Sequence, residues 1–388
     1  MGEWKWTTFI LFAGVAVVST QLIKRAESHV YYSIYKGQKK YTSLGRIYLT
    51  LTYVLLITLC IIRNVDLYPP YIGDAQTDST TDMQAYIYFF REGMTAGWDW
   101  KKILTFNQWE PLFYSLNLLI RAFTANHRVY WFILYTIYCV CLLYFLTHVF
   151  DRNMCYAVVP FFIVQLLYGM CALRSCIANA ICLVAYVQLQ RKKTVSFLVL
   201  VIAATLFHYT AIFVLPLVIV VSIGNKIKNN RREKCIALIV LFISLFVLMR
   251  PIAEYLIAQT KYSVYLGHRM TIIGQAPLIC CTICSLFFYN DIKKKFSSQL
   301  TFVYMVFYNF LVMPFIVEFN ISRISDFFML PRIVVWTLVV DCATDKIVEH
   351  RYKSIVKMGA FFIMFFWMIK TIYDMKNYGI MPYLAFWI

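Results

Sequence analysis

The sequence has 388 residues, of which 61% are hydrophobic and only 14% are charged, and its mean hydropathy is +0.66. Soluble domains carry roughly a quarter charged residues, and no soluble fold has an interior large enough for this much apolar surface. The composition therefore excludes a soluble globular protein. In lipid, such a chain forms helices, because each backbone polar group must be paired within its own segment.

Lys and Arg outnumber Asp and Glu by 37 to 19, which gives a formal net charge of +18. The basic excess lies in short loops between apolar runs, without the basic–aromatic motifs typical of nucleic-acid binding. We therefore expect no nucleic-acid partner and attribute the excess to the positive-inside rule. Most of the 12 cysteines lie within apolar runs, which favours packing roles over disulfides or a metal site.

Apolar runs that predict membrane-spanning helices follow one another along the chain. They are 7–22, 47–62, 129–149, 154–171, 175–190, 235–249, 272–289, 299–317, 327–342 and 355–374. Residues 195–223 are too long for one untilted span and too short for two, so we expect two half-length helices that meet near His208. Residues 111–125 are half apolar and contain Arg121, which predicts a short, tilted, re-entrant or interfacial helix. Together these patterns predict an all-α transmembrane bundle of about 10–13 membrane segments in a single domain, 1–388.

The basic loops set the expected orientation. They form five clusters, which run from Lys24 to Arg46, Arg191 to Lys193, Lys226 to Lys234, Lys293 to Lys295 and Lys346 to Lys353. The positive-inside rule places all five in the cytoplasm and both termini outside. Residues 63–128 then form an extracytoplasmic loop with interfacial or re-entrant helices. Its acidic and aromatic residues predict that the polar chemistry lies on the outer face.

Two polar residues next to apolar helices are candidates for function. Arg174 directly precedes an apolar helix, and a guanidinium at membrane depth normally faces a wet cavity or an anion such as phosphate. The alternative is an arginine that extends to the lipid headgroups. His208 lies between the two predicted half-length helices, a position that often marks a binding site. A single intramembrane histidine can also form only a hydrogen bond to a neighbouring helix.

The outer loop supplies candidate carboxylates. Asp78, Asp82 and Tyr86 follow one another at intervals of four residues, so a helix would place them on one face. Glu110 directly precedes Pro111, so its carboxylate either serves as a base or caps the helix N-terminus.

Further candidates lie later in the chain. Arg323 and Arg332 lie near the outer end of the predicted span 327–342, and two arginines there exceed what anchoring requires. Arg250, Tyr262 and Tyr265 lie in an outer loop, where Tyr and Arg are also ordinary interfacial residues. No nucleotide-binding, serine-hydrolase or zinc-site motif occurs in the sequence.

The order of these residues resembles that of the EpsG family of Wzy-type polysaccharide polymerases, over about residues 78 to 335. The matching features are Asp82 and Tyr86 in an acidic outer loop, Glu110 before Pro-Leu-Phe-Tyr, Leu173-Arg174 at the start of a helix that ends at Arg191-Lys-Lys, Leu206-Phe-His208-Tyr-Thr-Ala, and Ser322-Arg323 before Phe327-Phe328. Two positions depart from the family pattern. Ser175 follows the arginine where the family usually has Gln, and Thr210 stands two residues after the histidine where Ser is common.

The resemblance implies a GT-C-like membrane glycosyltransferase in the bacterial cytoplasmic membrane, with its active site facing outside. Its substrate would be a polyprenyl-diphosphate-linked oligosaccharide, transferred to the non-reducing end of another lipid-linked repeat unit. Neither a metal nor a nucleotide cofactor is expected, and a chain-length regulator protein is a candidate partner. The expected base is Glu110, Asp82 or His208; the expected diphosphate ligands are Arg174, Arg323, Arg250 and Arg332; and the expected sugar ligands are Asp78, Tyr86, Tyr262 and Tyr265.

Other functions use similar residues. Another GT-C-type transferase that moves a single sugar needs the same charges, and a transporter or flippase of lipid-linked glycans also needs arginines in a wet cavity. Transporters usually contain internal repeats, and none is visible here. A membrane acyltransferase with His208 as its base is a third alternative. The sharpest expectation is that Arg174, His208 and Arg323 line one outward-facing cavity, with Glu110 or Asp82 at its rim.

Overall fold

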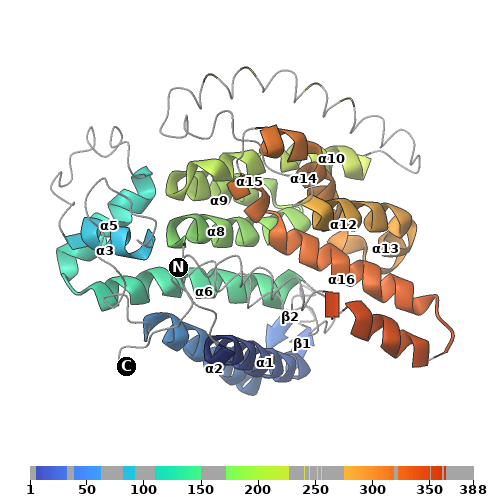
Figure 1. Ribbon diagram of the computed structural model, residues 1–388, viewed down its shortest axis with the longest axis horizontal. Helices are drawn as coiled ribbons and strands as arrows, with labels where there is room; N and C mark the ends of the chain where they lie inside the picture. The colour runs from blue at the N-terminus through green and yellow to red at the C-terminus, as the bar shows by residue number, and fades with distance from the viewer. Residues whose placement is uncertain are drawn as a thin grey trace. The chain divides into compact units, whose positions relative to one another are not determined.

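The computed structural model describes residues 6–32, 39–62, 82–91, 110–149, 172–226, 275–318, 322–349 and 351–360, together with 240, 244, 251, 255, 362 and 363 (Figure 1). These residues are almost entirely helical, which confirms the predicted all-α class. The predicted span 154–171 and most of 235–249 lie outside the described residues.

The helices have the following bounds. They are α1 (Trp6–Ser28), α2 (Ser43–Ile61), α3 (Asp82–Arg91), α5 (Pro111–Phe123), α6 (His127–Val149), α8 (Leu173–Gln190), α9 (Thr194–Phe207), the 3-10 helix η3 (Tyr209–Val214), α10 (Leu217–Lys226), α12 (Ala276–Phe287), α13 (Tyr289–Lys295), the 3-10 helix η6 (Ser297–Gln299), α14 (Leu300–Glu318), α15 (Ser322–Asp326) and α16 (Met329–Asp345). Residues 351–360 are also helical.

Within the described residues, four helical segments are long and apolar enough to cross a membrane. They are α2, α6, α8 and the continuous stretch Ser297–Glu318. Helices α5 and α9 have 13 and 14 residues. Each is therefore about 20 Å long, whereas the hydrocarbon core of a bilayer is about 30 Å thick. The half-length helices predicted near 111–125 and 195–223 are thus confirmed, and the chain is a membrane protein.

Two local features differ from the sequence expectation. The predicted span 272–289 is interrupted at Phe288, where α12 ends and α13 begins, so α12 alone is shorter than a full span. The residues soon after this break, Asn290-Asp291-Ile-Lys-Lys-Lys, are mostly polar, so the apolar run ends here. A small antiparallel sheet, β1 (Val30–Tyr32) with β2 (Lys39–Tyr41), precedes α2 and was not predicted.

The chain divides into two compact units. The first unit comprises residues 1–187, 202–209 and 358–388, and the second comprises 188–201 and 210–357. In the first unit, α2 packs against α1 and α6, and α3 and α5 also contact α6 (Figure 1). In the second unit, α14 packs against α10, α12 and α16. The prediction of a single domain stays a prediction.

Helix α8 is buried on nearly every side. Its sequence is rich in small residues, among them Cys176, Ala178 and Ala180, which are fully buried. Small side chains let neighbouring helices approach closely, which is how helices associate in lipid. The first turn of α8 is therefore held firmly, and this turn carries Arg174.

Two of the five basic clusters lie together in the second unit. Lys295 at the end of α13 contacts Asp341 and lies 2.6 Å from Asp345 of α16. The ammonium of Lys346 lies 2.8 Å from Asp291 and over the ring of Phe288. These pairs join the two clusters at one end of the second unit, which agrees with the prediction that both face the same side of the membrane.

Candidate functional site

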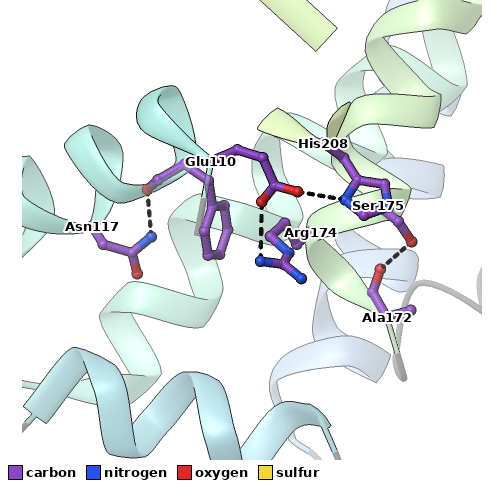
Figure 2. A network of polar contacts seen from close by, with 7 residues as sticks. Glu110, Asn117, Ala172, Arg174, Ser175 and His208 are labelled. Atoms are coloured by element: carbon purple, nitrogen blue, oxygen red, sulfur yellow. Dashed lines mark hydrogen bonds and ion pairs between the residues drawn. The ribbon is translucent and has the colours of Figure 1, made fainter. Parts of the chain in front are cut away.

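Three helix ends converge in the first unit (Figure 2). Glu110 immediately precedes α5, Arg174 lies in the first turn of α8, and His208 immediately follows α9. The Glu110 carboxylate is only 2% exposed, and it bridges the other two side chains. The three residues come from segments that are far apart in the sequence, so only the fold brings them together.

Glu110 does not cap its own helix. Pro111 occupies the first turn of α5, and Glu110 has the extended backbone of an N-cap residue, but its side chain makes no capping hydrogen bond. Instead, Oε1 lies 2.9 Å from Nδ1 of His208, and Oε2 lies 3.0 Å from Nη1 of Arg174. The alternative that this carboxylate merely caps the helix is therefore wrong.

Arg174 is positioned by the start of α8. The backbone N–H of Cys176 donates to the carbonyl of Ala172, and the hydroxyl of Ser175 donates to the same carbonyl at 3.1 Å (Figure 2). The Ser175 hydroxyl thus contacts the first turn of its own helix. The Arg174 side chain is 17% exposed, whereas Glu110 is almost completely buried.

His208 extends the buried face of α9. Phe197, Val201 and Ala204 are fully buried at helical spacing, and the His208 N–H donates to the Ala204 carbonyl, so the imidazole continues this face. The opposite stripe of α9, which includes Val195 and Val199, is exposed and apolar, as a lipid-facing surface requires. His208 therefore faces the protein interior.

The electrostatics of the site centre on the carboxylate. Burial alone would raise the pKa of Glu110, but the hydrogen bond from His208 and the positive charge of Arg174 outweigh burial and hold that pKa below its usual value. Glu110 is thus ionised at neutral pH. Because an ionised carboxylate can only accept, Nδ1 of His208 carries the hydrogen of their bond. In a neutral imidazole, Nε2 is then the basic nitrogen.

This geometry matches the chemistry of a positioned general base. A carboxylate that accepts from one imidazole nitrogen fixes the tautomer and stabilises the positive charge that forms when the other nitrogen takes a proton. A guanidinium beside the pair supplies fixed positive charge for an anion. The site can therefore combine proton abstraction with stabilisation of a negatively charged group.

The aromatic residue Tyr86 approaches this site from α3. Its ring contacts Phe113 of α5 and Trp131 of α6 edge-on, and the side chain is buried. Phe113 in turn contacts Phe207, the residue before His208. Three further residues near here, Asn117, Tyr130 and Trp131, were missed by sequence reasoning, because a Tyr–Trp pair at a helix end is typical of the membrane interface.

The described residues do not show where the remaining predicted site residues lie relative to this cluster. Asp78, Arg250, Tyr262 and Tyr265 lie outside the described residues, as do the side chains of Asp82 and Arg323. Arg332 is buried within the second unit, where its Nη2 lies 3.4 Å from the carbonyl of Ser325. Their roles, and the shared cavity with Arg323, stay predictions.

Short apolar helices that end at a buried cluster of ionisable side chains define a membrane protein with polar groups at the ends of its helices. The model of the EpsG family matches residues 74–385, and this chain belongs to that family. All three residues of the cluster lie within the match. No curated protein and no solved structure matches the chain. Membership fits a polysaccharide polymerase in general, with a lipid-linked oligosaccharide as its class of substrate.

Proposed function

We propose that this protein polymerises polyprenyl-diphosphate-linked oligosaccharide repeat units into a surface polysaccharide, such as an exopolysaccharide, a capsule or an O-antigen. The reaction takes place on the outer face of the bacterial cytoplasmic membrane. The observation that carries the proposal is the buried Glu110–His208 pair with Arg174 beside it, because glycosyl transfer from a diphosphate needs both a base and fixed positive charge.

The reaction balances without another reactant. The oxygen of an acceptor hydroxyl forms a bond to the anomeric carbon of the donor sugar, and the bond from that carbon to the diphosphate oxygen breaks. The electron pair leaves with the polyprenyl diphosphate, and the hydroxyl proton moves to the base. The donor is already activated, so neither a nucleotide nor a metal ion is needed for the step.

Each residue of the cluster has a distinct role in this mechanism. Nε2 of His208 takes the proton, and Glu110 orients the imidazole and stabilises its positive charge. Arg174 stabilises the negative charge on the departing diphosphate, for which its planar fork is suited. Asp82 stays an alternative base, and Arg323, Arg250 and Arg332 stay additional candidates for the diphosphate. Asp78, Tyr86, Tyr262 and Tyr265 stay candidates for the sugars.

The half-length helices support a lipid-linked substrate. Because α5 and α9 are shorter than the bilayer is thick, a site at their ends would be within reach of a diphosphate at the membrane surface. The exposed apolar stripe of α9 allows a polyprenyl tail to remain in lipid. The positive-inside rule supports a cytoplasmic position for the basic loops. A chain-length regulator protein stays a candidate partner.

The proposal can be tested with purified protein in proteoliposomes. The substrate is the lipid-linked repeat unit extracted from a strain that lacks the gene, in which it should accumulate. We expect a ladder of polymer with the native protein and a loss of about 100- to 10,000-fold for His208→Gln, which removes the base. The control is His148→Gln, because the His148 ring stacks on Tyr144 within α6 and has no place in the mechanism.

The products separate the alternatives. Addition of one sugar without a ladder would assign the protein to another class of lipid-linked-sugar transferase. Movement of the lipid-linked unit across the membrane without a new glycosidic bond would make it a transporter or flippase. Equal activity of His208→Gln and His148→Gln would remove His208 from the mechanism.

A further inference from the structure

Three buried polar atoms beside the candidate site have no hydrogen-bond partner in the part of the chain that the structure describes. They are Oδ1 of Asn117, the hydroxyl of Tyr130 and Nε1 of Trp131, and we call these residues the Asn-Tyr-Trp cluster. Asn117 and Tyr130 are completely buried, and Trp131 is 4% exposed.

Unpartnered atoms of this kind are rare because they are costly. Most buried side-chain polar atoms in proteins are hydrogen-bonded, and a buried Tyr or Trp usually finds a partner for its polar end. The amide nitrogen of Asn117 follows this rule, since it donates to the Phe113 carbonyl at 2.6 Å (Figure 2). Its carbonyl oxygen does not. The Asn117 side chain is close enough to interact with the Tyr130 hydroxyl, but no hydrogen bond of normal geometry joins them.

The chemistry of the cluster complements a sugar. It combines an acceptor in Asn117, a donor in Trp131 and a hydroxyl in Tyr130 that can do both. Neighbouring hydroxyls on a pyranose ring likewise act as donors and acceptors. The surroundings are aromatic, because the Tyr130 and Trp131 rings lie 4.9 Å apart and Tyr86 contacts Trp131 edge-on. A lipid tail would leave all three polar atoms without partners. A free phosphate, whose oxygens accept hydrogen bonds, would leave Oδ1 of Asn117 without a donor.

The location of the cluster links it to the diphosphate side of the site. Asn117 lies two turns along α5 from Glu110, so the two residues share a face of that helix (Figure 2). The Tyr130 phenol is within electrostatic range of Arg174 and Tyr86. Arg174 is the residue to which the proposed mechanism assigns the diphosphate. The sugar nearest to it is the one bonded directly to that diphosphate.

We propose that the Asn-Tyr-Trp cluster binds the first sugar of the donor, the ring attached to the diphosphate, through its hydroxyl groups. The proposal rests on the proposed function and extends it to the sugar that the site recognises. The cluster thereby holds the anomeric carbon between Arg174 and His208. Sugars that lack the matching hydroxyls leave the buried atoms unpaired, so the cluster also selects the donor.

The test compares Tyr130→Phe with Tyr138→Phe, an identical change at a fully buried tyrosine two turns further along α6. Binding is measured by the shift in melting temperature of detergent-purified protein. Two probes are used, the lipid-linked repeat unit and the polyprenyl diphosphate without sugars. We expect Tyr130→Phe to weaken binding of the repeat unit about tenfold, or about 1.4 kcal/mol, and to leave binding of polyprenyl diphosphate unchanged. Asn117→Leu, which lacks the acceptor oxygen, should behave in the same way.

The protein without ligand supplies a second readout. Because the Tyr130 hydroxyl makes no hydrogen bond within the described protein, its removal should leave the melting temperature unchanged or raise it. A drop of several degrees in Tyr130→Phe alone would show that the hydroxyl is bonded inside the protein and would overturn the proposal. Full binding of the repeat unit by Tyr130→Phe would also overturn it. If the native protein itself neither binds nor polymerises the repeat unit, the proposed function fails instead.

Discussion

Replacing Glu110 by Gln tests whether the buried carboxylate serves catalysis or only holds three helix ends together. Gln has the same shape, and its amide oxygen can still accept the hydrogen from Nδ1 of His208. The change therefore keeps the imidazole in place while it removes the negative charge. It also turns an amide toward Arg174, whose Nη1 lies 3.0 Å from Oε2 in the native protein.

The expected magnitudes follow from burial and charge. Removing one member of a buried ion pair costs about 3–5 kcal/mol of stability, because the other charge is left uncompensated. The partial exposure of Arg174 lets water relieve some of that cost, so we expect the lower end, about 3 kcal/mol. Positioned acid–base groups contribute about 100- to 10,000-fold to rates, so the loss of transition-state stabilisation should be about 2.7–5.4 kcal/mol.

Stability and activity can be separated with a second substitution. Melting temperature and polymer formation in proteoliposomes are measured for Glu110→Gln and for Glu110→Gln combined with Arg174→Gln. The double variant no longer contains an uncompensated guanidinium, so it should regain stability but not activity. Asp291→Asn is the matched control, because its pair with Lys346 is largely exposed and such pairs contribute about 0–1 kcal/mol. Near-native turnover by Glu110→Gln would refute a catalytic role for the carboxylate.

Four other predictions concern charge, pH, packing and topology. Arg174→Lys keeps the charge but loses the planar fork, so polymer yield in a deletion strain should fall about ten- to a hundredfold, whereas the exposed Arg128→Lys should have little effect. The pKa of Glu110 is lower in the folded protein than its usual value near 4.5. The carboxylate therefore contributes its full stability above pH 4.5 and loses it as the pH falls through the pKa of the folded protein. The difference in melting temperature between native protein and Glu110→Gln should shrink in acid. Gly224→Ala would place a Cβ 2.6 Å from the Tyr304 ring and should cost about 1–3 kcal/mol in thermal unfolding, whereas Gly14→Ala has nothing within 4 Å and should not destabilise. In intact cells, a membrane-impermeant thiol reagent should label Asp78→Cys but not Lys39→Cys, after labelling of the native cysteines is subtracted. Equal labelling of the two variants would reject the predicted orientation, in which the basic loops face the cytoplasm.

Much of the helical framework was predictable because the bilayer restricts the choices. An apolar run in lipid must be a helix, so α2, α6, α8 and α14 follow from hydropathy alone. The break near His208 was also predictable, since the apolar run 195–223 is too long for one untilted span and too short for two. Arg174 was identified because a guanidinium at membrane depth needs a partner, and His208 because it lies between two half-length helices. Glu110 was identified as an outer-loop carboxylate directly before Pro111.

The pairing of these residues could not be read from the sequence. Glu-Pro before a helix is equally compatible with a capping carboxylate and with one that turns away, and only the approach of α8 and α9 decides between them. The surroundings of Arg332 could not be read from the sequence either: its Nη2 lies 3.4 Å from the Ser325 carbonyl within the second unit, and its role at the diphosphate stays a prediction. Asn117, Tyr130 and Trp131 were overlooked because the burial of their unpartnered atoms exists only once the helices have packed.

The electrostatics of the cluster also fit the order of events in the proposed reaction. A single carboxylate can neutralise one full positive charge, and before the reaction Glu110 neutralises Arg174. As the glycosidic bond to the diphosphate breaks, negative charge builds up on the leaving group and attracts the guanidinium. The acceptor proton reaches His208 in the same step, and the imidazole then becomes the positive partner of Glu110. The carboxylate exchanges one cation for another while the total charge of the buried site changes little, which matters because uncompensated charge in an apolar region is costly.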